Sequence, residues 1–156
     1  MDLYIEETRN GKGICAARAF AAGETLYEVT GVFITGDVDE EIDETTRNNA
    51  FRYDENRYIS PAGSIGDFQN HACEPNAKVA RREDKLFVVA INPIQKGEEV
   101  MIDYSTIIGS DDEWEMTCNC AAASCRGTIK SFDTLPHALQ QRYIEQDIVP
   151  AYMRAL

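Results

Sequence analysis

Three of the five cysteines lie within eight residues of one another, a spacing that is typical of a metal site. Cys118, Cys120 and Cys125 form a C-x-C-x4-C cluster. Structural zinc sites hold the ion with four ligands in a tetrahedron, so this cluster lacks one thiolate. We expect Cys73 to supply it, because Cys15 falls on an expected strand, where a free cysteine is commonly just buried. The alternative is that the four residues are unconnected buried thiols.

Residues 70–76, which read NHACEPN, surround Cys73 with an amide, an imidazole and a rigid proline. Taken alone, this segment supports a weak functional prediction, since asparagine and proline commonly just form turns. A second short segment, residues 97–104, reads as a strand that ends in Asp103-Tyr104. A tyrosine there can present its phenol at the edge of a cleft, although tyrosine is also simply a favourable strand residue.

A pair of glycines near the N-terminus is the remaining chemical signal. Gly11 and Gly13 flank Lys12, and glycine lets a backbone approach a ligand closely. The segment lacks the further glycine of a dinucleotide-binding turn and the Lys-Ser/Thr pair of a P-loop. The sequence therefore excludes both of those nucleotide sites.

Short strands must position these segments. Apolar and β-branched residues predict strands over residues 4–6, 14–20 and 26–34, with a loop at 10–13 and a turn at 22–24. Residues 78–82 and 85–90 flank a turn at Glu83-Asp84, and a further strand is expected over 99–104. The sequence therefore predicts a mainly β fold.

The C-terminal end changes character and predicts one amphipathic helix over about residues 136–147. Leu139, Tyr143 and Ile144 fall on one face of such a helix. Thr134 is a suitable N-cap residue. We expect the apolar face of this helix to pack on the core.

Length and charge restrict the class of protein. The chain has 156 residues, enough for one modest domain and too few for two. Its net charge of −12 disfavours direct binding of nucleic-acid phosphates and attracts basic protein partners, although solubility is a simpler interpretation of that charge. Residues 37–44 hold six acids and are expected to form a solvated loop or short helix, or alternatively an acidic rim for a basic peptide.

The sequence carries neither of the usual signals for membrane insertion or secretion. No apolar run approaches the roughly 20 residues of a membrane span, and the N-terminus lacks the basic and apolar regions of a secretory signal. An odd number of cysteines without such a signal favours a reducing compartment and metal ligation over disulfides. We therefore expect a protein of the cytoplasm, or of the nucleus if the host is eukaryotic, with no membrane partner.

The order of the four chemical signals resembles that of SET-domain methyltransferases over nearly the whole chain. Residues 11–13 are similar to the family's N-terminal G-x-G, and residues 70–76 match its N-H-x-C-x-P-N at every defined position. Residues 99–104 resemble its E-L-T-x-D-Y motif. The last three cysteines match its post-SET C-x-C-x4-C, whose zinc takes a fourth thiolate from the N-H-x-C cysteine, here Cys73.

The resemblance implies a SET-domain fold, with small curved β-sheets around a pseudoknot, a post-SET zinc site and a C-terminal helix. In that fold, the segment with Asn70 and His71 lies beside the segment with Tyr104. The resemblance also implies a SET domain over residues 1–116, a post-SET zinc-binding segment over 117–130 and a C-terminal helical tail over 131–156.

The implied activity is methyl transfer from S-adenosylmethionine to the lysine amine of a basic protein, such as a histone-like or ribosomal protein. Tyr104 is implied to be the catalytic tyrosine of a narrow channel. The implied cofactor-binding residues are Gly11, Lys12, Gly13, Phe51, Asn70, His71, Tyr104 and Trp114. The alternative is a non-catalytic SET-like module that binds peptide or cofactor.

Four positions depart from the usual pattern of the family. Lys12 stands where many members have tryptophan, and Asp67 and Gln69 stand where many have arginine and isoleucine. Ile102 occupies a position where an aromatic residue often limits how many methyl groups fit. The resemblance therefore leaves the degree of methylation open.

Overall fold

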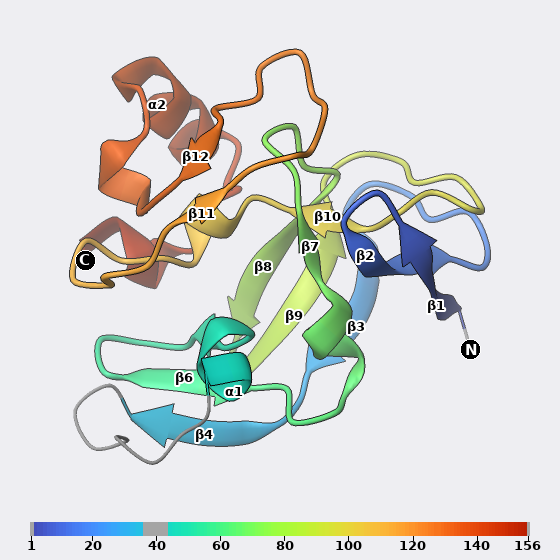
Figure 1. Cartoon of the computed structure of the whole chain (residues 1–156), viewed down its shortest axis with the longest axis horizontal. Helices are drawn as coiled ribbons and strands as arrows, with labels where there is room; N and C mark the ends of the chain where they lie inside the picture. The colour runs from blue at the N-terminus through green and yellow to red at the C-terminus, as the bar shows by residue number, and fades with distance from the viewer. Residues whose placement is uncertain (1, 36–43, 156) are drawn as a thin grey trace.

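The structure is a computed structural model that describes residues 2–35 and 44–155, and within them the strands form five small sheets (Figure 1). Two sheets are three-stranded: β3 (Thr25–Val29), β9 (Lys85–Ala90) and β8 (Ala77–Arg82) form one, and β4 (Val32–Thr35), β6 (Arg57–Ser60) and β5 (Phe51–Arg52) form the other. The two-stranded sheets pair β1 (Leu3–Thr8) with β2 (Gly11–Ala16), β7 (Asn70–His71) with β10 (Met101–Ile102), and β11 (Met116–Thr117) with β12 (Thr128–Ile129). The expected mainly β fold is confirmed. Except for Glu44, the acidic run 37–44 lies outside the described residues.

The N-terminal hairpin begins its second strand earlier than predicted. Thr8 pairs with Gly11, so the turn contains just Arg9 and Asn10. Gly11 has φ +88°, a conformation that glycine adopts without strain. The predicted loop at 10–13 is therefore wrong, because residues 11–13 already belong to β2.

The predicted strand over 26–34 is two strands that belong to different sheets. The break falls at Thr30 and Gly31, between β3 and β4. A Cβ atom on Gly31 would lie 1.8 Å from the carbonyl oxygen of Ser60, so this crossing requires glycine. Apolar periodicity does not detect such a change of sheet when the segments on both sides are apolar.

The hairpin of β8 and β9 forms as predicted, but the strand expected over 99–104 is short. Tyr104 instead begins the 3-10 helix η2 (Tyr104–Thr106). The carboxylate of Asp103 caps this turn by accepting a hydrogen bond from the backbone N–H of Ser105 at 3.0 Å. The capping interaction explains why extended structure ends before Tyr104.

Short helices connect the sheets and cover the C-terminal side. They are α1 (Glu44–Asn48), η1 (Ile65–Phe68), η3 (Phe132–Thr134), α2 (His137–Glu145) and η4 (Ala151–Ala155). The predicted C-terminal helix is confirmed as α2, although Pro136 rather than Thr134 is its N-cap residue. The hydroxyl of Thr134 donates to the carbonyl of Ser131 at 2.7 Å within η3, so this side chain is used before α2 begins.

Two apolar clusters hold the fold together. The larger lies between the sheets and includes Ile14, Leu86, Val88 and Ile102, each fully buried. The smaller lies under α2 and includes the buried Tyr143, so the predicted apolar face of the helix does pack inward. Among the described residues, no helix is long and apolar enough to cross a membrane.

Parallel pairing of β7 with β10 brings two distant motifs together near the middle of Figure 1. Asn70 pairs with Met101, and His71 pairs with Ile102. The backbone N–H of Ala72 extends the contact by donating to the carbonyl of Ile102 at 3.0 Å. The expected neighbourhood of the residues around 70 and around 104 is therefore confirmed.

Candidate active site and metal centre

Four cysteines converge where the loop after β7 meets the segment between β11 and β12. The Sγ atoms of Cys73, Cys118, Cys120 and Cys125 all lie within 4.8 Å of one another. Those of Cys73 and Cys118 are 3.8 Å apart. Tetrahedral zinc with bonds of about 2.3 Å separates its sulfur ligands by about 3.8 Å. The cluster could therefore hold a metal ion, and Cys15 is buried separately on β2.

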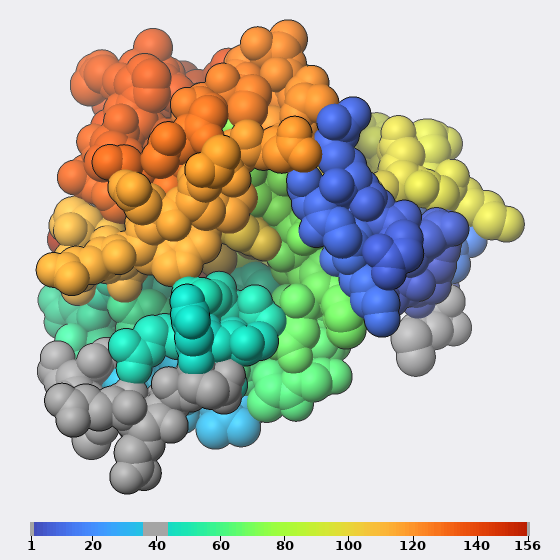
Figure 2. Space-filling view, viewed as in Figure 1, coloured from blue at the N-terminus to red at the C-terminus, as the bar shows by residue number. Residues whose placement is uncertain are grey.

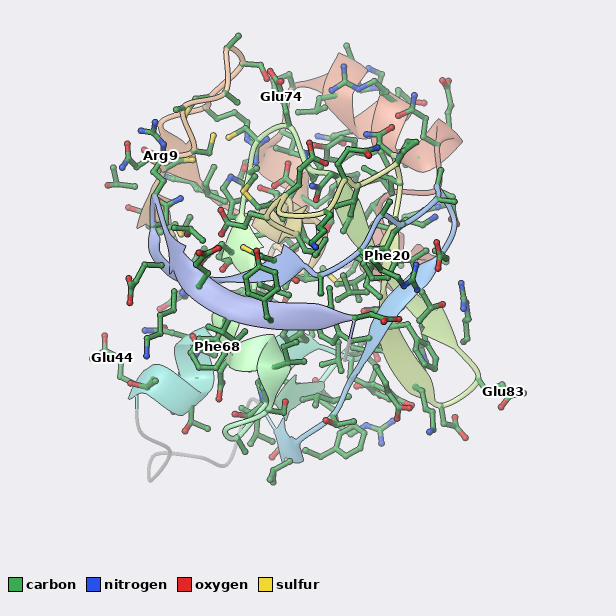
Figure 3. All side chains as sticks on the ribbon, turned by 90° about the vertical axis from the view of Figure 1, so that its right-hand side faces the viewer. Arg9, Phe20, Glu44, Phe68, Glu74 and Glu83 are labelled. Carbon is green, nitrogen blue, oxygen red and sulfur yellow. The ribbon has the colours of Figure 1, made fainter. Side chains whose placement is uncertain are left out.

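The thiols of the cluster differ in how readily they lose a proton. Burial raises the pKa of the Cys73 thiol well above its ordinary value and raises that of Cys118 to about 11. Burial has the same tendency at Cys120, but backbone hydrogen bonds from Cys73 and Ala122 lower its pKa to about 7. A divalent cation would stabilise the deprotonated set, because ligation by a metal removes the thiol proton. Figure 3 labels Glu74 beside this segment, where its carboxylate accepts from the hydroxyl of Ser124 at 2.8 Å.

His71 joins the cysteine cluster to Tyr104. Its Nδ1 atom accepts a hydrogen bond from the backbone N–H of Tyr104 at 3.0 Å, and its Nε2 atom lies 3.3 Å from Sγ of Cys73. Burial lowers the pKa of His71 to about 4, although Asp103 opposes this shift. The imidazole is therefore neutral near pH 7, with its proton on the nitrogen that faces Cys73.

Asp103, the residue before Tyr104, contacts two of the C-terminal segments. This buried carboxylate accepts two hydrogen bonds from the guanidinium of Arg126, at 2.8 and 2.7 Å. It also accepts one from the hydroxyl of Tyr143 on α2 at 2.8 Å. Because Arg126 follows Cys125 of the cysteine cluster, one carboxylate links the cysteine segment, α2 and the Tyr104 turn.

The hairpin of β1 and β2 is held against β7 by Asn70. The amide nitrogen Nδ2 of this residue donates to the carbonyl of Lys12 at 3.1 Å and to the carboxylate of Glu99 at 2.7 Å. A Cβ atom on Gly13 would lie 2.2 Å from that carboxylate and 2.8 Å from Nδ2 of Asn70. Glycine at this position therefore permits the close approach of the three segments. Figure 3 shows the hairpin in front, with Arg9 labelled at its turn and Phe68 of η1 below it.

Tyr104 lies at the wall of a cavity of about 570 Å³. Phe51, Gln69, Tyr104 and Trp114 contribute to the lining, and the rings of Tyr104 and Trp114 are 5.9 Å apart. In Figure 2, two segments that line the cavity, α1 in teal and the segment that includes Trp114 in gold, lie next to each other on the face toward the viewer. Five carboxylates and one arginine also line the cavity: Glu55, Asp67, Asp111, Asp112, Glu113 and Arg47.

The side chain of Tyr104 is half-buried, and its hydroxyl has a defined hydrogen-bond acceptor. Its hydroxyl donates to the backbone carbonyl of Gln69, and burial raises its pKa well above the ordinary value, with a smaller contribution from Glu99. The side-chain oxygen of Gln69 accepts from the hydroxyl of Tyr27 at 2.8 Å. Tyr104 is therefore a neutral phenol with a fixed donor direction.

The structure divides the residues expected at the cofactor into two groups. Phe51, Tyr104 and Trp114 share the cavity. Gly11, Lys12, Gly13, Asn70 and His71 lie on β2 and β7 instead. The groups meet where His71 contacts Tyr104, with ring centroids 5.3 Å apart.

Several residues that organise this site carried no signal of their own in the sequence. In the sequence, Tyr27 is simply one residue of an expected strand, and Gln69 differs from the family pattern without indicating a role. Arg52 is fully buried, and its guanidinium contacts Asp111 and Asp112 at the cavity wall, at 2.5 and 3.0 Å. Arg126 could have been suspected, because it directly follows a cysteine of the cluster.

Comparison with known proteins agrees with this geometry. Residues 11–105 match the SET domain, and the chain therefore belongs to the SET-domain family. The histone-lysine N-methyltransferase, H3 lysine-4 specific, of Saccharomyces cerevisiae is 33% identical over 138 residues, which is 80% of this chain. The histone-lysine N-methyltransferase Set2 of Drosophila melanogaster is 30% identical over 139 residues, which is 78% of this chain.

These relatives are much longer than the region they share with the chain. The matched region is 13% of the yeast protein and 6% of the Drosophila protein. Among solved structures, a Plasmodium falciparum protein described as a histone methyltransferase has a TM-score of 0.55 and 24% identity. That match covers 66% of this chain and 92% of the Plasmodium chain, and it supports the fold.

Proposed function

We propose that the chain is an S-adenosylmethionine-dependent methyltransferase that methylates lysine side chains of a protein substrate. The observation that carries the proposal is the half-buried phenol of Tyr104 at the cavity wall. His71 accepts a hydrogen bond from the backbone N–H of this residue, and the Gln69 carbonyl accepts one from its hydroxyl. Membership of the SET-domain family and the names of the relatives support the same reaction.

Tyr104 is the proposed catalytic residue. When bound, S-adenosylmethionine supplies a methyl group on a positively charged sulfur. The hydroxyl of Tyr104 donates its hydrogen bond to the Gln69 carbonyl. The lone pairs of the phenol oxygen are therefore available to accept from the substrate amine or from a polarised methyl C–H. Correct placement of the two reacting groups supplies much of the rate in such a displacement.

The substrate lysine must lose a proton before it reacts. A free lysine has a pKa of about 10.4, so about 0.04% is neutral at pH 7. The apolar side chains of Phe51, Ile107 and Trp114 at the cavity wall disfavour the ammonium form by removing water from it. The part of the cavity beside these apolar side chains therefore favours the reactive amine, whereas the carboxylates elsewhere in the lining attract the ammonium form.

The proposed substrate is a basic protein, histone-like or ribosomal. Acidic residues outnumber basic residues in the cavity lining, and the net charge of the whole chain is −12. A negative surface around a site attracts lysine-rich and arginine-rich segments. The names of the relatives, which specify histone lysines, support the same class.

We propose that one structural zinc ion is held by Cys73, Cys118, Cys120 and Cys125, whose spacing fits a tetrahedral site. Four thiolates leave no coordination position for water, so this ion organises the fold and takes no part in the reaction. Gly11, Lys12, Gly13, Asn70 and His71, together with Phe51, Tyr104 and Trp114, are the proposed contacts of the cofactor.

The proposed division into residues 1–116, 117–130 and 131–156 is supported by the separate apolar cluster under α2. The contact of Asp103 with Arg126 and Tyr143 joins all three parts. A reducing compartment, cytoplasmic or nuclear, is proposed because the five cysteines are free thiols and four of them converge.

Transfer of a radiolabelled methyl group tests the proposed function. S-adenosylmethionine labelled at the methyl carbon is incubated with recombinant core histones and, separately, with purified ribosomal proteins. We expect labelled lysine, identified by mass spectrometry. Tyr104→Phe should abolish most of the transfer, while binding of S-adenosylhomocysteine, measured by calorimetry, stays near that of the unmodified chain.

Two other outcomes distinguish the alternatives. Binding of S-adenosylhomocysteine without transfer to either substrate set would favour a non-catalytic cofactor-binding or peptide-binding module. Equal transfer by the unmodified chain and by Tyr104→Phe would contradict the role of this phenol.

A further inference from the structure

Gln69 is a buried amide whose side chain is fully engaged beside Tyr104. It is 6% exposed. Its Nε2 atom donates to the carbonyls of Val100 at 2.9 Å and Asn70 at 3.0 Å, and its Oε1 atom accepts from the hydroxyl of Tyr27 at 2.8 Å. Three hydrogen bonds therefore fix the conformation of this side chain: two reach the distant segments of Val100 and Tyr27, and one reaches the adjacent residue Asn70.

The backbone carbonyl of Gln69 is also the acceptor for the hydroxyl of Tyr104. A carbonyl can only accept, so the phenol proton must lie on this bond. The phenol oxygen then has lone pairs and no proton to offer on its remaining side. The orientation of the Gln69 carbonyl therefore decides whether Tyr104 acts as an acceptor or as a donor toward the cavity.

Tyr27 connects this arrangement to the three-stranded sheet of β3, β9 and β8. It lies on β3 and pairs with Val88 of β9. The register between these strands shifts between Thr25 and Tyr27, and an irregularity of this kind redirects the side chains of the strand that carries it. The hydroxyl of Tyr27 therefore reaches Gln69 from a rigid support rather than from a loop.

Given the proposed methyltransferase function, we propose that Gln69 and Tyr27 are positioning residues for Tyr104. Their hydrogen bond holds the Gln69 carbonyl where it accepts the hydrogen bond of the Tyr104 hydroxyl, so that the phenol oxygen presents lone pairs to the amine. Neither side chain needs to touch the substrate or the cofactor for this role.

Two variants and a matched control test the proposal. Tyr27→Phe removes one hydroxyl, and Gln69→Met removes all three side-chain hydrogen bonds at similar volume. Tyr53→Phe is the control, because Tyr53 is buried and its hydroxyl donates to the backbone carbonyl of Asp84 at 3.2 Å. With histone H3 as substrate, we expect kcat to fall about threefold in Tyr27→Phe and about tenfold or more in Gln69→Met, with KM for S-adenosylmethionine unchanged.

A double-mutant cycle separates positioning from a general loss of stability. In the Tyr104→Phe background there is no phenol proton to position, so adding Tyr27→Phe should leave the residual rate unchanged. The proposal is overturned if Tyr27→Phe lowers the rate by the same factor in both backgrounds. It is also overturned if kcat is unchanged in both Tyr27→Phe and Gln69→Met.

A measurement without turnover distinguishes failure of this proposal from failure of the proposed function. The ¹³Cζ chemical shift of a labelled tyrosine reports the hydrogen bond of its hydroxyl. We expect the Tyr104 signal, assigned by its absence in Tyr104→Phe, to move in Tyr27→Phe and Gln69→Met and to stay in Tyr53→Phe. Absence of methyl transfer by the unmodified chain contradicts the proposed function, whereas an unmoved Tyr104 signal in both variants overturns the positioning role.

Discussion

The imidazole of His71 accepts a hydrogen bond at 3.0 Å from the backbone N–H of Tyr104, a residue 33 positions further along the chain. A backbone N–H can only donate, so Nδ1 of His71 carries no proton. The opposite nitrogen faces Sγ of Cys73 at 3.3 Å. One buried ring thus connects the start of the Tyr104 turn with the proposed zinc site.

This relationship predicts different outcomes for two substitutions of His71. His71→Leu leaves the buried N–H of Tyr104 without an acceptor and should lower the free energy of unfolding by about 2 to 3 kcal/mol. His71→Asn places an amide oxygen near the former position of Nδ1, so its free energy of unfolding should fall clearly less than that of His71→Leu. Urea unfolding of the zinc-loaded protein measures both values, and equal losses would contradict the acceptor role.

Metal content is a direct prediction from the cysteine cluster. Freshly purified protein should contain about one zinc per chain, since four thiolates complete a tetrahedral site. Chelation, or Cys120→Ser, should increase hydrogen exchange over residues 116–129 before it does so in β8 and β9. Cys15→Ala is the control, because Cys15 is buried outside the cluster, and its zinc content should remain that of the unmodified chain. A metal content well below one in fresh protein would exclude the site.

Removal of the Arg126 guanidinium should destabilise the chain strongly. Arg126→Ala leaves the fully buried carboxylate of Asp103 without its cation. We expect a loss of about 3 to 5 kcal/mol in the free energy of unfolding, as for other broken buried ion pairs. Lys130→Ala breaks an exposed ion pair with Glu115 and should cost at most about 1 kcal/mol. Similar losses of unfolding free energy in the two variants would contradict a larger contribution from the buried Asp103–Arg126 pair than from the exposed pair.

Arg52 should hold the cavity wall that carries Trp114. Arg52→Met removes the buried cation that contacts Asp111 and Asp112, and we expect a loss of about 2 to 4 kcal/mol in the free energy of unfolding. Hydrogen exchange over residues 107–114 should increase. Arg57→Met is the matched control, since the Arg57 side chain is 48% exposed and its ion pair with Asp54 is local. Unchanged exchange over 107–114 in Arg52→Met would contradict this role.

Gly13→Ala tests the close approach of the N-terminal hairpin. The new methyl group would lie within 3 Å of the side-chain ends of Glu99 and Asn70, so these side chains must shift and their hydrogen bond must be disturbed. We expect the affinity for S-adenosylhomocysteine to fall about tenfold or more, which corresponds to about 1.4 kcal/mol. Calorimetry measures the affinity, and thermal unfolding without ligand measures the separate cost in stability. Unchanged affinity would remove Gly13 from the proposed cofactor site.

Local sequence was sufficient to predict the elements with a strong pattern. The hairpin of β8 and β9 and the helix α2 both follow from apolar periodicity with turn residues between or beyond them. Residues 26–34 predict a single strand because both halves of the segment are apolar. Its division between two sheets depends on the contact of Gly31 with Ser60, which lies far away in the sequence.

The sequence by itself determined which groups are available for chemistry: four cysteines with zinc spacing, and the motifs that carry Gly13, Asn70 and Tyr104. Ligand type and motif order are local properties, so they can be read from one chain. The tertiary structure decided how those groups are held. Gln69 and Tyr27 became relevant through hydrogen bonds to distant segments, as did Arg126 through its contact with Asp103. Such partners depend on how the strands pair and on what each fold buries, and neither the type of a residue nor its spacing specifies them.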